Sequence, residues 1–248
     1  MEIDAYFTPY FPEKETQFDD AIVIMIDVLR ASTTICASLY NGAKEVIPSE
    51  TLDRAVKLYS SLSKETRFIG GERNGIMPTG FDAGNSPFEY TEEMVKDKTV
   101  IISTTNGTQI FQKAKQAKAR IIAGFVNNKS VLNYIDLNIK QGAEAATKII
   151  VLCAGNSGRL AYEDTLCAGS VINSLKSMNN NVYLTDTADA AKNLYNLHSI
   201  DYKDFLKKRQ HAMYLSELGF DKDIDLCLTF DCFPVVPIII GSSIRKAH

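Results

Sequence analysis

Short apolar runs alternate with helical patterns along most of this chain. We expect buried strands at 21–26, 44–48, 67–71, 99–103, 120–124 and 148–153, where isoleucine and valine follow one another without polar alternation. Helical spacing predicts helices at 31–42, near 107–117, at 130–141, and from an N-cap at Ser49 to Leu62. Continuous apolar strands alternating with helices indicate an α/β fold, with a mostly parallel sheet covered on both faces.

The last third of the chain has a different pattern. A helical tract over roughly 164–218 is followed by two apolar segments, 225–231 and 235–241, which we predict as strands. Pro234 and Pro237 favour an edge of the sheet, and we expect one of these strands to run antiparallel there. We find no convincing linker and expect residues 1–248 to form a single domain. The long loop at 71–90 is rich in Gly, Pro and Asn, which is more typical of a functional loop than of a connector.

Composition narrows the class of protein. The chain has 248 residues and a net charge of -3, and this ordinary balance argues against non-specific nucleic-acid binding. The longest apolar run is far shorter than the ~20 residues of a spanning helix, and the N-terminus has no signal-peptide pattern. Five cysteines without a CxxC pair predict neither a disulfide framework nor structural zinc. We therefore expect a cytoplasmic enzyme without a membrane or nucleic-acid partner.

The most informative segment is CAGNSGRLAYEDTLCAG, residues 153–169. A buried strand, a Gly-rich turn and a helix start make an anion site, because backbone N–H groups and the helix dipole favour negative charge. Glu163 and Asp164 would repel a bare anion, so a cation is expected between them and the ligand. Magnesium with a phosphate ester is the simplest such pair. The same loop has a Cys-x5-Arg spacing, from Cys153 to Arg159, which suits a cysteine nucleophile, so two phosphatase chemistries stay open.

Polar residues follow four predicted strands, at the edge where ligands bind in open α/β sheets. Asp27 suits a metal ligand or a nucleophile, although a helix cap is an equal alternative. Haloacid-type phosphatases carry a second Asp two residues later, and Leu29 excludes that class. The segment STTNGT, residues 103–108, could bind phosphate or sulfonate oxygens or serve only as a helix cap.

Three arginines lie close to these strand ends. Arg30, Arg73 and Arg159 could converge on one anion, because a guanidinium binds carboxylate, sulfonate or phosphate in bidentate fashion. Cys153 is either an inert core residue or, beside arginine, a reactive thiolate that the neighbouring carboxylates oppose. His211 could face a pocket, but the histidines form no metal-ligand pattern.

Taken together, these segments resemble the 2-phosphosulfolactate phosphatase family, a magnesium-dependent group associated with coenzyme M synthesis. The resemblance covers nearly the whole chain, in order, through 26–34, 70–75, 80–90, 103–108 and 153–169 to the region of Asp231. It implies a three-layer α/β/α domain with a mostly parallel or mixed sheet. It also implies hydrolysis of a phosphate monoester, of 2-phosphosulfolactate or of a similar small phosphorylated hydroxy acid.

The chemistry of the residues assigns the expected roles. We expect a catalytic set of Asp27, Cys153 and Asp164, and Mg²⁺ ligands drawn from Asp27, Glu163 and Asp164. The expected substrate-binding residues are Arg30, Glu72, Arg73, Asn85, Ser86, Thr104, Thr105, Asn106, Gly107, Gly155 and Arg159. A non-catalytic binder of a small dianion is the other class, and the acidic residues near the arginines favour the enzyme. The expected partner is a small anionic phosphoester, and a homodimer is left open.

Overall fold

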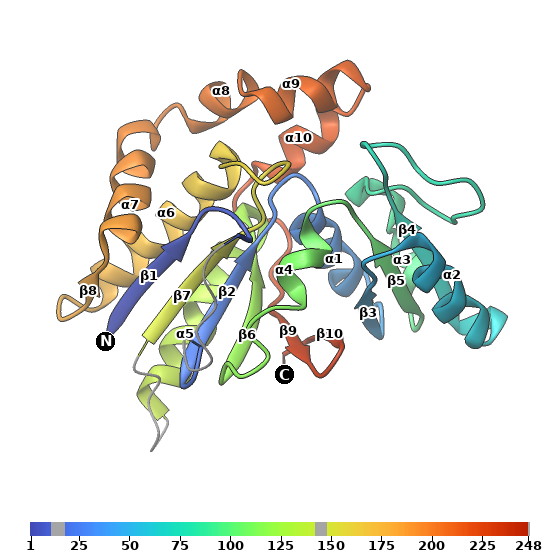
Figure 1. Ribbon diagram of the computed structural model, residues 1–248, viewed down its shortest axis with the longest axis horizontal. Helices are drawn as coiled ribbons and strands as arrows, with labels where there is room; N and C mark the ends of the chain where they lie inside the picture. The colour runs from blue at the N-terminus through green and yellow to red at the C-terminus, as the bar shows by residue number, and fades with distance from the viewer. Residues whose placement is uncertain (11–17, 142–147, 248) are drawn as a thin grey trace.

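The computed structural model describes residues 1–10, 18–141 and 148–247 and contains a ten-stranded sheet in the order β4-β5-β3-β10-β9-β6-β2-β7-β1-β8 (Figure 1). The strands are β1 Glu2–Tyr6, β2 Ala21–Ile26, β3 Glu45–Pro48, β4 Arg67–Gly71, β5 Thr99–Ser103, β6 Ala119–Ala123, β7 Lys148–Cys153, β8 Tyr183–Leu184, β9 Pro237–Ile240 and β10 Ser243–Lys246. The helices are α1 Ala31–Tyr40, α2 Leu52–Ser61, α3 Glu92–Val95, α4 Gly107–Phe111, α5 Asn128–Gln141, α6 Tyr162–Met178, α7 Asp186–His198, α8 Tyr202–Lys207, α9 Gln210–Glu217 and α10 Asp221–Cys227. The expected α/β class with a mostly parallel, mixed sheet is confirmed.

Two parallel blocks of strands make up the sheet. One contains β4, β5 and β3, and the other contains β6, β2, β7, β1 and β8. The β9–β10 hairpin joins them through single antiparallel bridges, Ile121 to Ile238 and Ile244 to Val46. Figure 1 shows the blocks inclined to each other, with α1 and α4 between them and α8, α9 and α10 above.

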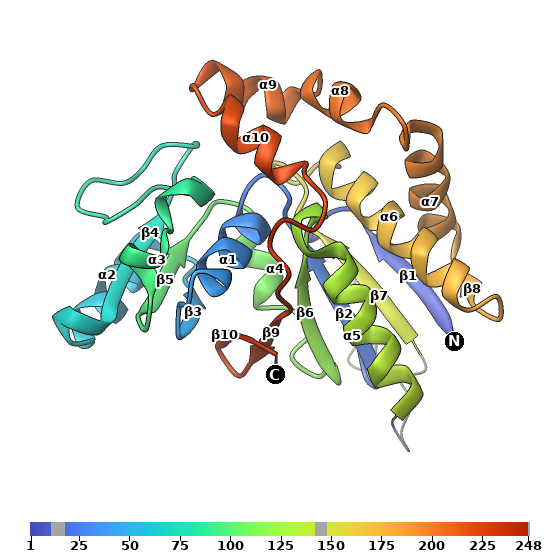
Figure 2. The same ribbon diagram turned by 180° about the vertical axis from the view of Figure 1, so that it is seen from behind.

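Strand β2 shows why both faces of the sheet must be covered. Ile22, Ile24 and Ile26 pack into one apolar cluster with residues of α5 and α6, and Val23 and Met25 pack into another with residues of α1 and α4. Figure 2 shows α5 and α6 on the face that is hidden in Figure 1. A strand buried on both faces needs apolar side chains at every position, which accounts for the unbroken AIVIMI run.

Some expected elements differ from the structure. Thr51, not Ser49, caps α2, because its hydroxyl accepts a hydrogen bond from the Arg54 N–H at 3.2 Å. The predicted strand at 225–231 is wrong, since residues 221–227 form α10. Strand β9 is antiparallel as expected, but it lies inside the sheet order, with Pro237 as its first residue. The expected helix near 107–117 is the shorter α4, and β1 was not predicted.

The helices carry no membrane-crossing signal. Within the described ranges, none of them is both long enough and apolar enough to span a bilayer.

Candidate active site

A cavity of about 650 Å³ lies where the carboxyl ends of β2, β4 and β5 meet helix α9. The polar wall comes from the strand ends, and Met213, Tyr214 and Leu215 of α9 add a more apolar wall. Seven of the residues expected at the site line it: Asp27, Arg30, Glu72, Asn85, Thr104, Thr105 and Asn106. The others lie outside the lining: Arg73, Ser86, Gly107, Cys153, Gly155, Arg159, Glu163 and Asp164.

Asp27 follows β2 directly, and its backbone N–H donates to the Ser32 hydroxyl at 2.9 Å. A Cβ atom built on Gly107 would lie 2.5 Å from Asp27 Oδ2, so glycine there leaves room for the carboxylate. The pKa of Asp27 is raised from 3.8 to about 7. Burial is the largest cause; the nearby His211 opposes it, and the charges of Glu72 and Glu163 add to it. Asp27 therefore gains a proton readily unless a cation lies close.

Glu72 connects the two loops on the other side of the cavity. Its Oε2 accepts the Gly75 N–H at 2.8 Å, and its Oε1 accepts the Thr105 N–H at 2.7 Å. Thr105 was expected to bind substrate oxygens, and in the structure its backbone N–H is bound to this carboxylate. Glu72 thus presents a negative charge where the STTNGT segment meets the 71–90 loop.

Asp164 has a similar bridging arrangement behind the cavity. Its Oδ1 accepts the Val28 N–H at 2.8 Å, and its Oδ2 accepts the Gly155 N–H at 2.9 Å. These bonds tie the loop after β2 to the loop after β7, and they use an amide of the turn that was expected to bind a phosphate. Burial, with the charges of Asp27 and Glu163, raises the pKa of Asp164 well above its ordinary value despite the two hydrogen bonds.

Glu163 pairs with a histidine from a distant part of the chain. Its Oε1 lies 2.6 Å from Nδ1 of His211, which is on α9 and lines the cavity. Burial alone would lower the pKa of His211, but the hydrogen bond and charge of Glu163 and the charge of Asp27 raise it overall. The sequence placed His211 near a pocket without a role, and 48 residues separate it from its partner.

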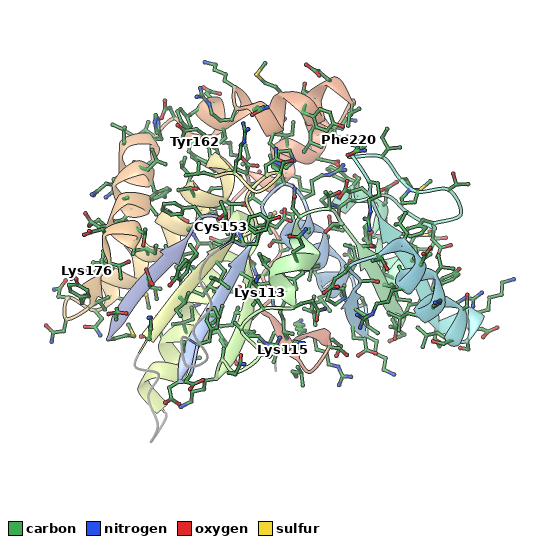
Figure 3. All side chains as sticks on the ribbon, in the orientation of Figure 1. Lys113, Lys115, Cys153, Tyr162, Lys176 and Phe220 are labelled. Atoms are coloured by element: carbon green, nitrogen blue, oxygen red, sulfur yellow. The ribbon has the colours of Figure 1, made fainter. Side chains whose placement is uncertain are left out.

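Arg30 lies in a buried network. Its Nη1 donates to Asp223 Oδ2 at 2.6 Å, its Nη2 donates to the Gly75 carbonyl at 3.2 Å, and its guanidinium lies 4.1 Å from the Phe220 ring centroid. Phe220 lies between α9 and α10, above the strand ends (Figure 3). The Ser86 hydroxyl donates to the other oxygen of Asp223 at 2.7 Å. The expected substrate residues Arg30 and Ser86 are thus joined by Asp223, which sequence analysis missed.

The other two arginines do not join Arg30 in the lining. Arg73 donates to the carbonyls of Glu72, Glu50 and Ser103 and to the Ser103 hydroxyl. Arg159 is exposed and closes the turn of its own loop by exchanging backbone hydrogen bonds with Asn156. Their substrate-binding roles therefore stay predictions that depend on a rearrangement.

Asn85 is the buried amide of the cavity wall. It is 4% exposed, and the Thr34 hydroxyl donates to the backbone carbonyl oxygen of Asn85 at 2.9 Å. Its side-chain Oδ1 is buried and has no hydrogen-bond partner within the described ranges. An unsatisfied buried oxygen is costly, so a ligand or water that reached this amide would be bound favourably.

Cys153, at the end of β7, lies within the apolar core (Figure 3). It is 0% exposed and does not line the cavity. Burial, with the charges of Asp164 and Glu163 and the neighbouring Cys167, raises its pKa well above the ordinary value. A thiolate is therefore disfavoured at this position.

The carboxylates expected to bind magnesium differ in their access to the cavity. Glu163 and Asp164 do not line the cavity and bond to protein groups, while Asp27 and Glu72 line it together. Among the residues that the structure describes, no three His, Cys, Asp or Glu side chains form a ready metal cage. Mg²⁺ is usually held by one or two carboxylates, with waters and substrate phosphate completing its shell. Asp27 and Glu72 fit that mode. Both oxygens of Glu72 accept a backbone N–H, but each keeps a second lone pair for a metal ion.

The charges of the lining also favour a cation. Among its described residues, the carboxylates are Asp27, Glu72 and Glu217, and the cationic groups are Arg30 and His211. The charge of Arg30 is already offset by Asp223. A polyanionic ligand would therefore enter a cavity with excess negative charge unless it arrived with a metal ion.

Comparisons with known proteins find similar sequences over nearly the whole chain. A family model described as 2-phosphosulpholactate phosphatase matches residues 6–241. A relative from Caldanaerobacter subterraneus subsp. tengcongensis is 37% identical over 226 residues, which cover 91% of this chain and 90% of the relative. One from Thermotoga petrophila is 39% identical over 218 residues, 88% of each chain, and one from Clostridium beijerinckii is 34% identical over 223 residues, 90% of each. All three are described as probable 2-phosphosulfolactate phosphatases.

Proposed function

This chain belongs to the 2-phosphosulpholactate phosphatase family, and from that premise we propose that it hydrolyses the phosphate monoester of 2-phosphosulfolactate to sulfolactate and phosphate with the help of Mg²⁺. A similar small phosphorylated hydroxy acid would present the same groups to the site. The observation that carries the proposal is the meeting of Asp27, Glu72 and Arg30 in one cavity at the strand ends.

The magnesium ion would be held by Asp27 and Glu72. When bound, it would neutralise phosphate charge and lower the pKa of a bound water, which can then attack phosphorus. The raised pKa of Asp27 supports this placement, because a cation beside a carboxylate that otherwise gains a proton near neutrality restores the charged form. Glu163 and Asp164 were the other predicted ligands. Glu163 would contribute by holding His211, and Asp164 would contribute by joining the loops after β2 and β7.

The remaining lining groups would bind the substrate. Asn85, Thr104, Thr105 and Asn106 line the cavity and carry the amides and hydroxyls that phosphate, sulfonate and carboxylate oxygens need. Arg30 would offer substrate oxygens those of its five N–H donors that Asp223 and Gly75 do not use, while these two partners hold it in place. Polar groups fixed in advance reduce the entropy lost when a small substrate is oriented.

Two alternatives have less support. A cysteine-nucleophile phosphatase would need Cys153 as an accessible thiolate, and its burial in the core argues against that role. A non-catalytic dianion binder would have no use for carboxylates beside its anion site, and Asp27 and Glu72 would weaken its affinity. The cysteine-nucleophile phosphatase predicts turnover that survives a chelator, and the dianion binder predicts binding without turnover.

The test is phosphate release from 2-phosphosulfolactate and a panel of small phosphoesters, with Mg²⁺ and with a chelator. We expect turnover only with Mg²⁺, and we expect Asp27→Asn to reduce kcat by at least about 100-fold. Asp53→Asn, an exposed carboxylate change on α2, is the matched control and should leave kcat unchanged. Turnover that persists in chelator would refute the metal assignment, and ligand binding without turnover would favour the binder.

A further inference from the structure

His211 is the described lining residue best suited to give a proton to a leaving group. It is the second residue of α9, so the helix that closes the cavity carries it over the strand ends. Its side chain is 15% exposed, while that of its partner Glu163 is 3% exposed. The imidazole therefore lies between a buried carboxylate and the open cavity.

The pairing with Glu163 orients the ring. An ionised carboxylate only accepts hydrogen bonds, so Nδ1, at 2.6 Å from Glu163 Oε1, carries a proton. The opposite nitrogen, Nε2, is then left for the cavity. Glu163 is itself held in the first turn of α6, a long buried helix, so the ring has a rigid support.

The reaction needs an acid on the cavity wall. Hydrolysis of an alkyl phosphate expels an alkoxide, a poor leaving group unless its oxygen is protonated in the transition state. Arg30 does not give up a proton in proteins. The Tyr214 hydroxyl already donates to the Asn74 carbonyl at 2.9 Å. Asp27 and Glu72 are assigned to the metal, and Glu217, the third carboxylate of the described lining, is exposed to solvent on α9. His211 is the lining acid whose position is set by a partner, Glu163.

We propose that His211 is the general acid of the reaction and that Glu163 is its positioning residue, an inference that rests on the proposed phosphatase function. The bond between phosphorus and the ester oxygen breaks while a bond to the oxygen of water forms. The reacting ring is the imidazolium, with a proton on each nitrogen. Nε2 gives its proton to the departing ester oxygen, which becomes the product hydroxyl, and Nδ1 keeps its proton against Glu163. The proton lost by the attacking water returns to the imidazole through solvent, so the cycle closes.

The kinetic test compares two leaving groups. His211→Asn keeps an amide donor near Glu163 but removes Nε2, so the buried carboxylate stays paired. Removing a general acid typically costs about 100- to 10,000-fold. We expect that loss in kcat on 2-phosphosulfolactate, and less than about tenfold on p-nitrophenyl phosphate, whose phenolate leaves without a proton. His198→Asn changes a histidine that also lies near a carboxylate, Asp201 at 3.3 Å, but outside the cavity lining, and should change neither rate.

Equal losses on both esters, or no loss, would overturn the role of His211 while leaving the phosphatase assignment intact. If the wild-type protein hydrolyses no ester, the phosphatase assignment fails and the role falls with it. Nitrogen NMR of the imidazoles gives a readout that needs no substrate, and only three histidines have to be assigned. We expect protonated Nδ1 in the wild type and a changed His211 signal in Glu163→Gln; an unprotonated Nδ1 would overturn the proposal.

Discussion

Removing the positive charge of Arg30 should destabilise the protein more than any change at an exposed ion pair. Arg30 and Asp223 are both at most 5% exposed and lie 2.6 Å apart. Arg30→Met keeps much of the side-chain length and can still pack near Phe220. It leaves Asp223 as a buried charge whose one remaining side-chain partner, among the residues that the structure describes, is the Ser86 hydroxyl.

The magnitude follows from that uncompensated charge. Removing one partner of a buried pair typically costs about 3–5 kcal/mol. A protein of this class has a total unfolding free energy of about 5–15 kcal/mol, so the variant should lose a large fraction of it. In a chain of this size each kcal/mol lowers Tm by roughly 2–4 °C, which predicts a fall of about 6–20 °C.

Urea denaturation followed by circular dichroism measures the loss. The double variant Arg30→Met with Asp223→Asn removes the orphaned charge and keeps an acceptor for Ser86, so it should recover at least about 2 kcal/mol of the single-variant loss. Lys96→Met breaks an exposed pair with Glu92 and should leave the urea midpoint unchanged. A loss below about 1 kcal/mol in Arg30→Met, or no recovery in the double variant, would refute the reasoning.

Three further outcomes are expected. Gly107→Ala places a Cβ 2.5 Å from the Asp27 carboxylate, so it should lower the free energy of unfolding by about 1–3 kcal/mol and reduce kcat strongly. Gly124→Ala, whose Cβ has its nearest contact at 3.6 Å, should lower both less. Equal effects of the two changes in urea denaturation and kinetics would contradict this. Because the pKa of Asp27 is raised from 3.8 to about 7, its contribution to stability is full below pH 3.8 and is lost as pH rises through 7. Thermal unfolding in chelator should show this fall of stability with pH, and Asp27→Asn should make the fall smaller. Cys153→Ala should retain most of kcat, and recovery of a phosphocysteine from quenched wild-type reactions would show the opposite.

The wrong element assignments have identifiable causes. Residues 225–231 read as a strand because apolar residues alternate there, yet they cannot reach the sheet: Asp223 is held by Arg30, and the Phe220 carbonyl accepts the Ile224 N–H in a helical turn. Strand β1 was missed because Glu2 and Asp4 interrupt its apolar residues. Its buried residues, Ile3 and Ala5, take their apolar surroundings from β7 and other distant parts of the chain, which the local sequence does not show.

The sequence predicted several of the residues that lie at the site, but not the hydrogen bonds between them. The rule that ligands bind at strand ends places Asp27, Glu72 and the Ser103–Thr108 segment together from the sequence alone. It did not reveal that the amides of Gly155 and Thr105, expected to bind substrate, are taken by Asp164 and Glu72. A loop amide can bind a ligand or a side chain of the same protein, and sequence spacing does not distinguish the two.

What the sequence determined by itself is therefore the local and periodic part of the molecule. Unbroken Ile/Val runs require strands buried on both faces, and turn residues after them place polar groups at one edge. Only the tertiary structure decided the partners: Asp223 for Arg30, His211 for Glu163, and the core rather than the cavity for Cys153. The first two pairings cross 193 and 48 residues. Such contacts depend on how helices α9 and α10 fold back over the strand ends, which no local pattern specifies.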